Sequence, residues 1–211
     1  MKNVLVVDAG LGNIGSVINA FERAGTHVIT KGEPKEIESG SVSHIVLPGV
    51  GTYNQGMKSL RERGWYEWIK ENAGMKNKPM LGICLGMQLM SDKGTEGNET
   101  NEDIVGLGLI GGRVEKICNN KVRLPHIGWN NVKWKSDNNG IINDTNRKDD
   151  YYFVHSYHFI AKNEESVIGT VEYDRQIVAA VKHKNTIGVQ FHPEKSQKAG
   201  SELIKNFLDM E

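Results

Sequence analysis

Short apolar runs, each followed by a glycine-containing turn and then by helical periodicity, occur three times within the first hundred residues. The runs Val4–Val7, Ile45–Leu47 and Pro79–Ile83 precede predicted helices over 13–24, 53–70 and 85–90. Apolar strands that alternate with amphipathic helices favour parallel pairing, because the helices cross over the faces of the sheet. The pattern therefore predicts an α/β protein in which helices cover both faces of a largely parallel sheet.

Strand signals dominate the second half of the chain. Beyond Gly108, apolar and β-branched runs alternate with polar turns. These runs predict strands over 113–117, 131–134, 151–154, 166–172, 177–182 and 186–190. Helical periodicity returns only at 198–210. The polar segment 91–103 lacks either periodicity, which predicts a mobile loop beside whatever site Cys84 occupies.

Length and charge narrow the class of protein. The 211 residues contain no internal repeat or low-complexity tract, so we expect a single domain over 1–211. Lys and Arg number 26, as do Asp and Glu, so no net charge draws the protein to nucleic acid or to an anionic membrane. The first apolar run is too short for a signal peptide or a membrane span, which favours a cytoplasmic protein. Cys84 and Cys118 are too few for a disulfide scaffold and predict free thiols.

Cys84 stands between two glycines at a predicted strand-to-helix junction, in the sequence Gly82-Ile83-Cys84-Leu85-Gly86. This is the context of a G-x-S-x-G nucleophile elbow, with Cys in place of Ser. Small flanking residues permit the sharp turn that exposes the side chain above the sheet. The following helix directs its N-terminal N–H groups and positive dipole end at the sulfur, which favours a thiolate. A buried core thiol is the alternative interpretation.

A thiolate nucleophile needs a general base, and that base needs an acceptor on its other ring nitrogen. His192 follows the predicted strand 186–190, and Glu194 lies two residues further on, where it can face the same side. Acyl transfer also needs donors for a developing oxyanion, and the backbone N–H groups of Gly51 and Leu85 are candidates. The remaining histidines lack a comparable setting, and we expect most to be surface or packing residues: 27, 44, 126, 155, 158 and 183.

Four motifs together resemble those of the class I, or triad, glutamine amidotransferases. They are PGVG at 48–51, GICLGMQ at 82–88, TEG at 95–97 and VQFHPEKS at 189–196. Three further motifs are similar to the amidotransferase subunits of imidazole glycerol phosphate synthases: DAGLGNIGSV at 8–17, LPHIGWN at 124–130 and YFVHSY at 152–157. The resemblance covers nearly the whole chain. It implies an open, mostly parallel sheet flanked by helices, with an antiparallel portion in the strand-rich second half.

The resemblance implies a role for each matching residue. Cys84 is implied as the nucleophile, His192 as its base and acid, and Glu194 as the group that orients His192. The implied glutamine-binding positions are Gln88, Glu96, His155, Ser156 and Tyr157, and the implied interface positions are Asn13, Trp129 and Lys195. No cofactor and no metal are implied. The implied activity is hydrolysis of glutamine to glutamate and ammonia. The ammonia passes to a cyclase subunit, a HisF-like barrel, within a heterodimer of histidine biosynthesis.

Three positions depart from the usual pattern of these subunits. Ala9 stands where an aromatic residue is common, Gly15 where a larger polar residue is common, and Gly111 where a proline is usual. All three lie near the expected partner face. A paralogue that supplies ammonia to a synthase amidinating surface-polysaccharide sugars is therefore the alternative within the family.

Two alternatives come from other classes. The sequence Gly-Leu-Gly-Asn-Ile-Gly at 10–15 satisfies G-x-G-x-x-G between a strand and a helix, as in dinucleotide-binding modules. Such a module has an acidic residue at the end of its second strand, whereas Ile29–Gly32 contains none, and Glu33 is the nearest. That interpretation also leaves 82–86 and 191–194 without a role. A structural subunit with an inactive triad requires a missing triad residue, and none is missing.

Overall fold

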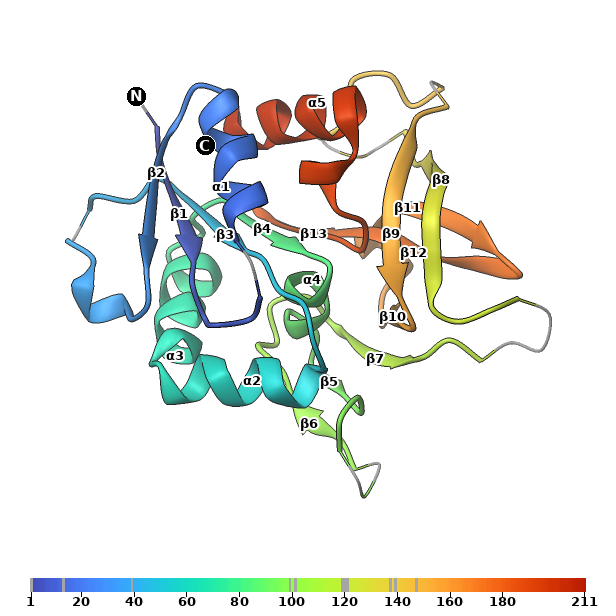
Figure 1. Cartoon of the computed structure of the whole chain (residues 1–211), viewed down its shortest axis with the longest axis horizontal. Helices are drawn as coiled ribbons and strands as arrows, with labels where there is room; N and C mark the ends of the chain where they lie inside the picture. The colour runs from blue at the N-terminus through green and yellow to red at the C-terminus, as the bar shows by residue number, and fades with distance from the viewer. Residues whose placement is uncertain are drawn as a thin grey trace.

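The computed structural model of the chain describes residues 2–12, 14–38, 40–98, 100, 102–118, 122–136, 138, 140–146 and 148–211. A large mixed sheet crosses the molecule (Figure 1). Within the described residues it has nine strands, in the order β2-β1-β3-β4-β13-β12-β11-β8-β9. Their bounds are β1 Asn3–Val7, β2 His27–Lys31, β3 His44–Leu47, β4 Met80–Ile83, β8 His126–Trp134, β9 Asp150–His155, β11 Val167–Tyr173, β12 Arg175–His183 and β13 Thr186–Val189.

The sheet is parallel in one half and antiparallel in the other. Strands β2, β1, β3, β4 and β13 pair in parallel, and β13, β12, β11, β8 and β9 pair antiparallel. Every residue of β3, β4 and β13 is buried, as expected for parallel strands covered on both faces. The predicted α/β fold with a mostly parallel part and an antiparallel second half is confirmed.

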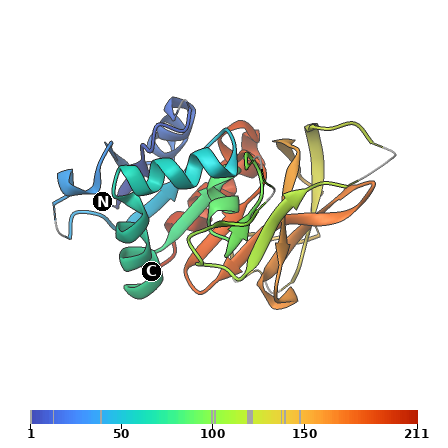
Figure 2. The same cartoon turned by 90° about the horizontal axis from the view of Figure 1, so that it is seen from below.

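Helices cover the parallel half on both faces (Figures 1 and 2). On one face lie α1 (Gly15–Arg23) and α5 (Gln197–Leu208). On the other lie α2 (Tyr53–Glu62), α3 (Trp65–Ile69) with the π-helical turn Lys70–Met75, and α4 (Leu85–Leu89). Alternate residues of β1 pack into two separate cores: Val4 and Val6 face α1 and α5, and Leu5 and Val7 face α2 and α3. Short 3-10 turns lie at Pro34–Glu36, Glu164–Ser166 and Pro193–Lys195.

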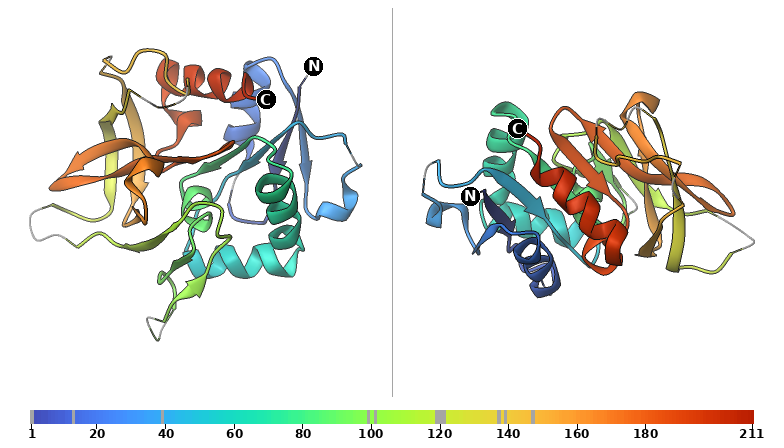
Figure 3. Two further views of the ribbon diagram at one scale, coloured as in Figure 1. Left: turned by 180° about the vertical axis from the view of Figure 1, so that it is seen from behind. Right: turned by 90° about the horizontal axis from the view of Figure 1, so that it is seen from above.

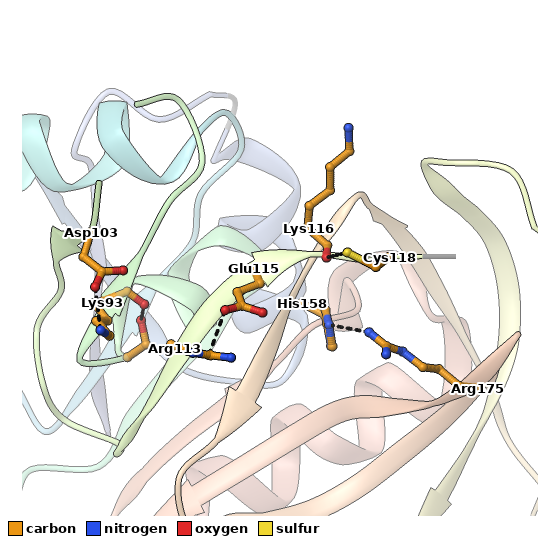
Figure 4. Close-up of polar contacts among 9 residues, drawn as sticks. Lys93, Asp103, Arg113, Glu115, Lys116, Cys118, His158 and Arg175 are labelled. Carbon is orange, nitrogen blue, oxygen red and sulfur yellow. Dashed lines mark hydrogen bonds and ion pairs between the residues drawn. The ribbon is translucent and has the colours of Figure 1, made fainter. Parts of the chain in front are cut away.

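A second, smaller sheet lies beside the large one, with the order β10-β7-β5-β6 in the part of the chain that is described. Its strands are β5 (Lys93–Gly94), β6 (Ile104–Val105), β7 (Gly112–Lys116) and β10 (Tyr157–Ala161). Ion pairs Lys93–Asp103 and Arg113–Glu115 lie on it, and Arg175 of β12 contacts His158 of β10 (Figure 4).

Three strands of the second sheet, β5, β6 and β10, were not predicted from the sequence. Strand β10 was not predicted, because its apolar residues follow β9 after the single residue Ser156 and carry no turn signal of their own. The segment 91–103, predicted as a loop, contains β5, which forms by pairing with β7 rather than from any local alternation of apolar residues.

The described ends of the chain lie at the same end of the molecule (Figure 3), where Lys2 Nζ donates to the carbonyl of Met210 at 3.4 Å. The parallel strands β1, β3, β4 and β13 all end at the opposite edge. In open α/β sheets, ligands bind outside the carboxyl ends of the strands. None of the helices formed by the described residues combines the length and apolarity needed to cross a bilayer.

Candidate active site

Cys84 occupies the sharp turn between β4 and α4. Its backbone has a φ of 53° and a ψ of −108°, a conformation that residues other than glycine rarely adopt. The backbone N–H of Cys84 donates to the carbonyl of Val189 in β13 at 2.8 Å, which fixes the turn against the sheet. The side chain is 7% exposed and lines a cavity.

The glycines on either side of Cys84 permit a close approach of backbones. A Cβ on Gly86 would lie 1.8 Å from the carbonyl oxygen of Leu47 in β3, and one on Gly82 would lie 2.8 Å from the backbone of Gly86. Real Cβ atoms do not come this close to other atoms. The tight packing of α4 on β3 and β4 therefore accounts for the G-x-C-x-G pattern.

His192 and Glu194 form a buried pair beside Cys84. His192 follows β13, and Glu194 belongs to the 3-10 turn Pro193–Lys195. His192 Nδ1 lies 2.7 Å from Glu194 Oε1, and the two side chains are 5% and 4% exposed. No hydrogen-bond partner is found among the described residues for His192 Nε2 or for Glu194 Oε2. The ring is thus oriented through Nδ1, and Nε2 is left available.

The pKa of His192 reflects its neighbours. Burial by itself lowers the pKa of an imidazole, but the interactions with Cys84 and with the Glu194 carboxylate outweigh this and raise the pKa of His192 to about 9. A protonated His192 between a sulfur and a carboxylate is the arrangement of a thiol and base that share a proton. The geometry and charge of the site therefore fit nucleophilic catalysis by Cys84.

A cavity of about 270 Å³ opens in front of Cys84, near the lower end of the range for small-molecule sites. Its lining includes every predicted catalytic, oxyanion and glutamine-binding residue except Glu194, which contacts the cavity residue His192. Its lining is Val50, Gly51, Cys84, Leu85, Gln88, Glu96, Pro125, Val154, His155, Ser156, Tyr157 and His192. These residues come from both halves of the chain, so the cavity exists only in the folded protein.

Glu96 is fixed in the cavity by the start of α2. Its carboxylate accepts the backbone N–H of Tyr53 at 3.2 Å, and its carbonyl accepts that of Asn54 at 3.0 Å. Burial raises the pKa of Glu96, and the hydrogen bond from Tyr53 partly opposes this rise. The segment that carries Glu96 is thus hydrogen-bonded to a helix, which the prediction of a mobile loop over 91–103 did not anticipate.

The segment 48–51 contributes Val50 and Gly51 to the lining of the cavity. Gly51 has a φ of 112°, within the range that favours glycine. The N–H of Val50 donates to the carbonyl of Leu11 at 3.0 Å, so it points toward the loop after β1. In this conformation Gly51 and Leu85 both line the cavity, where the sequence predicted oxyanion donors.

Two of the three predicted interface residues, Trp129 and Lys195, fall within the described residues. Trp129 in β8 is 48% exposed, and its ring lies 5.8 Å from that of Tyr152. Lys195 Nζ lies 5.7 Å from the centre of the same Tyr152 ring. The structure thus brings Trp129 and Lys195 together around Tyr152. Asn13 lies outside the described residues.

The side chain of Val50 packs against the glycine-rich turn 10–12. A Cβ on Gly12 would lie 2.3 Å from Val50 Cγ2. Among the described residues, no group of three or more His, Cys, Asp or Glu side chains could hold a metal ion.

Sequence reasoning missed two residues of the site. Gln190 is fully buried, and its Nε2 donates to Cys84 Sγ at 3.7 Å. His126 is buried and stacked on Phe153 and Tyr173, as expected of a packing residue, but its Nδ1 also lies 3.0 Å from Nε2 of the cavity residue His155. Gln190 lies within the motif VQFHPEKS, and His126 lies within LPHIGWN. The available sequence signal was the two-residue spacing of Gln190 and His192, which places both side chains on the same face of an extended chain.

Comparison with known proteins finds similarity to glutamine amidotransferases. The family model described as glutamine amidotransferase class-I matches residues 5–210. A protein of Prochlorococcus marinus named imidazole glycerol phosphate synthase subunit HisH 1 is 42% identical over 208 residues, which cover 97% of this chain and 96% of that protein. A HisH subunit of Pelagibacter ubique is 39% identical, with 99% and 100% of the two chains covered.

Solved structures show the same fold at low sequence identity. A PurLQS structure from Thermotoga maritima matches with a TM-score of 0.76 at 18% identity, over 99% of this chain and 98% of that one. A crystal structure of a glutamine amidotransferase matches with a TM-score of 0.72 at 18% identity, over 97% of each chain.

Proposed function

The chain belongs to the class I glutamine amidotransferase family, and from that premise we propose that Cys84, His192 and Glu194 hydrolyse glutamine to supply ammonia to a partner synthase. The observation that carries the proposal is the buried His192–Glu194 pair at 2.7 Å, beside a strained cysteine that opens into a small cavity.

The cavity offers complementary groups to both ends of glutamine. The Glu96 carboxylate lies where it can pair with the α-ammonium group, and Gln88 and the backbone around His155, Ser156 and Tyr157 line the remaining wall. The carboxamide then faces Cys84 Sγ. The N–H groups of Gly51 and Leu85 are the donors for the oxyanion that forms when the carbonyl is attacked.

The reaction proceeds through a thioester. Cys84 Sγ, having given its proton to His192, attacks the carboxamide carbon and forms a tetrahedral oxyanion. His192 returns the proton to the nitrogen, the carbon–nitrogen bond breaks, and ammonia leaves. Water then attacks the γ-glutamyl thioester, His192 accepts its proton, and glutamate and the thiol are released. Glu194 keeps Nδ1 of His192 bonded throughout, so that Nε2 carries each proton.

The partner is a second subunit. The relatives named above are HisH subunits of imidazole glycerol phosphate synthase, and we place this chain in the same role in histidine biosynthesis. The proposed partner is the cyclase subunit, a HisF-like barrel, bound as a heterodimer over the surface around Trp129 and Lys195, with Asn13 assigned there by its motif alone. Ammonia is useful only unprotonated, which favours its transfer inside a complex.

A cytoplasmic location belongs to the same proposal, because both Cys84 and Cys118 are free thiols. The alternative of a paralogue that serves a synthase amidinating surface-polysaccharide sugars is not favoured. The relatives that match over nearly their whole length carry the imidazole glycerol phosphate synthase name. The departures at Ala9, Gly15 and Gly111 leave the cavity untouched, since none of the three lines it.

Glutamate release from glutamine tests the proposal. The full chain is mixed with a purified cyclase subunit of imidazole glycerol phosphate synthase or, separately, with a polysaccharide-amidinating synthase. We expect hydrolysis to rise only with the cyclase subunit, and Cys84→Ala to lower it by at least about a thousandfold.

Cys118→Ala is the matched control, because that thiol is exposed and lies outside the cavity. Wild-type rates in Cys84→Ala would contradict the catalytic assignment. Stimulation by the amidinating synthase alone would contradict the assigned partner.

A further inference from the structure

The carbonyl of Tyr157, on the wall of the proposed glutamine site, accepts two side-chain hydrogen bonds. His155 Nδ1 lies 2.8 Å from this oxygen, and Gln88 Nε2 lies 3.0 Å from it. A carbonyl oxygen has two lone pairs and cannot donate, so both partners must be donors. This single backbone atom therefore fixes the orientation of the Gln88 amide and the position of the proton on His155.

The orientation of the Gln88 amide determines the orientation of Gln190, which contacts the nucleophile. Gln88 Nε2 also donates to Gln190 Oε1 at 3.0 Å, which turns the Gln190 Nε2 group toward Cys84 Sγ at 3.7 Å. A flipped Gln190 amide would oppose two N–H donors. Gln88 and Gln190 are 4% and 0% exposed, so water cannot replace either contact cheaply.

The proton position on His155 likewise fixes two further residues. Because Nδ1 of His155 carries the proton, its Nε2 is an acceptor, and it lies 3.0 Å from His126 Nδ1. His126 must then donate through Nδ1 and accept through Nε2, which lies 3.4 Å from Asn130 Nδ2. Every donor in this series meets an acceptor only while both imidazoles are neutral.

The surroundings keep both imidazoles neutral. Burial lowers the pKa of His126 to about 4, and burial together with the nearby His126, His158 and His192 lowers the pKa of His155 to about 3. His126 is also held between aromatic rings, 3.9 Å from that of Tyr173 and 4.8 Å from that of Phe153. At neutral pH the hydrogen bonds therefore have one consistent direction.

We infer that Asn130, His126, His155, Gln88 and Gln190, which we name the neutral chain, hold the Cys84 sulfur and the glutamine-site wall in their reactive geometry. Gln190 contacts the reacting sulfur directly. His126 is a positioning residue that acts through His155 and the Tyr157 carbonyl. The inference rests on the proposed function, because it assigns these residues to the same nucleophile and the same substrate.

The rate of alkylation by iodoacetamide measures the reactivity of the Cys84 sulfur directly and needs no partner subunit. The modification rates of Cys84 and Cys118 are followed by peptide mass spectrometry in the full chain. Cys118 is an exposed thiol two residues beyond the end of β7 (Figure 4) and serves as the internal reference in every sample. Gln190→Met keeps the length of the side chain and removes the N–H donor. Gln190→Glu keeps the acceptor for Gln88 and removes the donor to sulfur.

We expect both Gln190 variants to lower the Cys84 rate roughly tenfold, the effect of losing a hydrogen bond to a charged group. The Cys118 rate should stay the same. If one variant fails to fold, the other gives the answer. A wild-type Cys84 rate in a folded Gln190 variant would overturn the inference for Gln190.

Protection of Cys84 by L-glutamine against alkylation measures how well the cavity binds glutamine. His126→Phe keeps the stacking with Tyr173 and Phe153 but removes both ring nitrogens. It should weaken protection by about tenfold, because His155 Nε2 is left buried without a donor. His126→Gln restores a donor and should recover most of the affinity. His44→Phe is the matched control, since His44 is also buried but packs against Phe207 at the far end of β3.

The outcomes separate the two proposals. Wild-type Cys84 that glutamine does not protect would count against the proposed function itself. Wild-type protection that persists unchanged in His126→Phe, or that falls equally in His44→Phe, would overturn the inference while leaving the proposed function in place.

Discussion

Cys84 combines strain with support at the scale of a single residue. A φ of 53° with a ψ of −108° costs of order 1–3 kcal/mol for a residue other than glycine. The hydrogen bond from its N–H to Val189 and the close contact of Gly86 with Leu47 hold the turn in place. These contacts maintain the strained backbone, and the turn places Cys84 in the wall of the cavity.

The interactions of His192 with Cys84 and Glu194 make the stability of the fold depend on pH. The pKa of His192, about 9 in the folded protein, lies above the ordinary value of 6.5. The folded protein therefore keeps a proton between about pH 6.5 and pH 9 that the unfolded chain releases. This contribution to the free energy of unfolding is complete below pH 6.5 and is lost as pH rises through 9.

Glu194→Gln should reduce that dependence, because it removes the carboxylate charge that raises the pKa of His192. NMR titration of the ring should give a pKa near 9 in the wild type and a lower value in the variant. Urea unfolding at several pH values should show a smaller loss of stability from pH 6.5 to 9 in the variant. A wild-type ring that titrates at or below 6.5 would contradict this account.

Sequence could assign Cys84, His192 and Glu194 to one site because motif order carries that information. It could not assign Gln190 or His126 to it. The role of each residue depends on which of its side-chain atoms donates and which accepts a hydrogen bond. The Tyr157 carbonyl sets these donor and acceptor roles, and its position depends on the tertiary arrangement of β9 and β10. Spacing along the chain contains nothing about the direction of a hydrogen bond between distant residues.

At the scale of elements, the packing of α4 on β3 sets the position of the nucleophile. Gly86→Ala should destabilise the protein by at least about 2 kcal/mol, because its Cβ would overlap the carbonyl of Leu47 and push α4 away. Gly111→Ala is the control, since its nearest contact would be an ordinary 3.6 Å, and we expect a change within about 0.5 kcal/mol. Denaturant unfolding measures both. Equal stability of the two variants would show that this close contact is not required.

The α2 N-terminus and Glu96 give a second test at this scale. Glu96→Gln should raise the KM for glutamine about tenfold or more with little change in kcat, because it removes the carboxylate that we propose pairs with the α-ammonium group. The amide oxygen of the substituted side chain at position 96 can still accept the N–H of Tyr53, so the thermal stability of the protein should change little. An unchanged KM would mean that glutamine does not contact Glu96.

Most elements with a strong local pattern were predictable, and those formed by pairing were not. The helices α1 and α5 follow from apolar spacing, and the structure places each within a few residues of its predicted range. Strand β8 begins at His126, five residues before its predicted start, because polar and glycine residues there pair with β9. Tertiary pairing, rather than side-chain pattern, extends that strand.

At the scale of the whole molecule, the sheet brings distant parts of the chain to one edge. Cys84 after β4, His192 after β13 and the segment 48–51 after β3 meet because the three strands are parallel neighbours. Strand β9 adds Val154 and His155 to the cavity wall, and its antiparallel neighbour β8 carries the exposed side chains of Ile127 and Trp129. The cavity thus lies between the carboxyl ends of the parallel strands and the surface proposed to bind the partner.

Trp129→Ala should weaken binding of the cyclase subunit by at least tenfold, because exposed aromatic residues often dominate the energy of interfaces. Val105→Ala is the control, as this residue is also exposed but lies on the second sheet. Calorimetric titration measures both affinities. Equal affinities for the two variants would remove β8 from the interface.

Labelling of Cys84 by a glutamine-derived affinity reagent tests the central claim most directly. The full-length wild type and Cys84→Ala are incubated with the reagent, and the modified peptide is identified by mass spectrometry. The account predicts one adduct per wild-type chain, on Cys84, prevented by excess glutamine and missing from Cys84→Ala. The same adduct on both proteins would show that Cys84 is not the nucleophile.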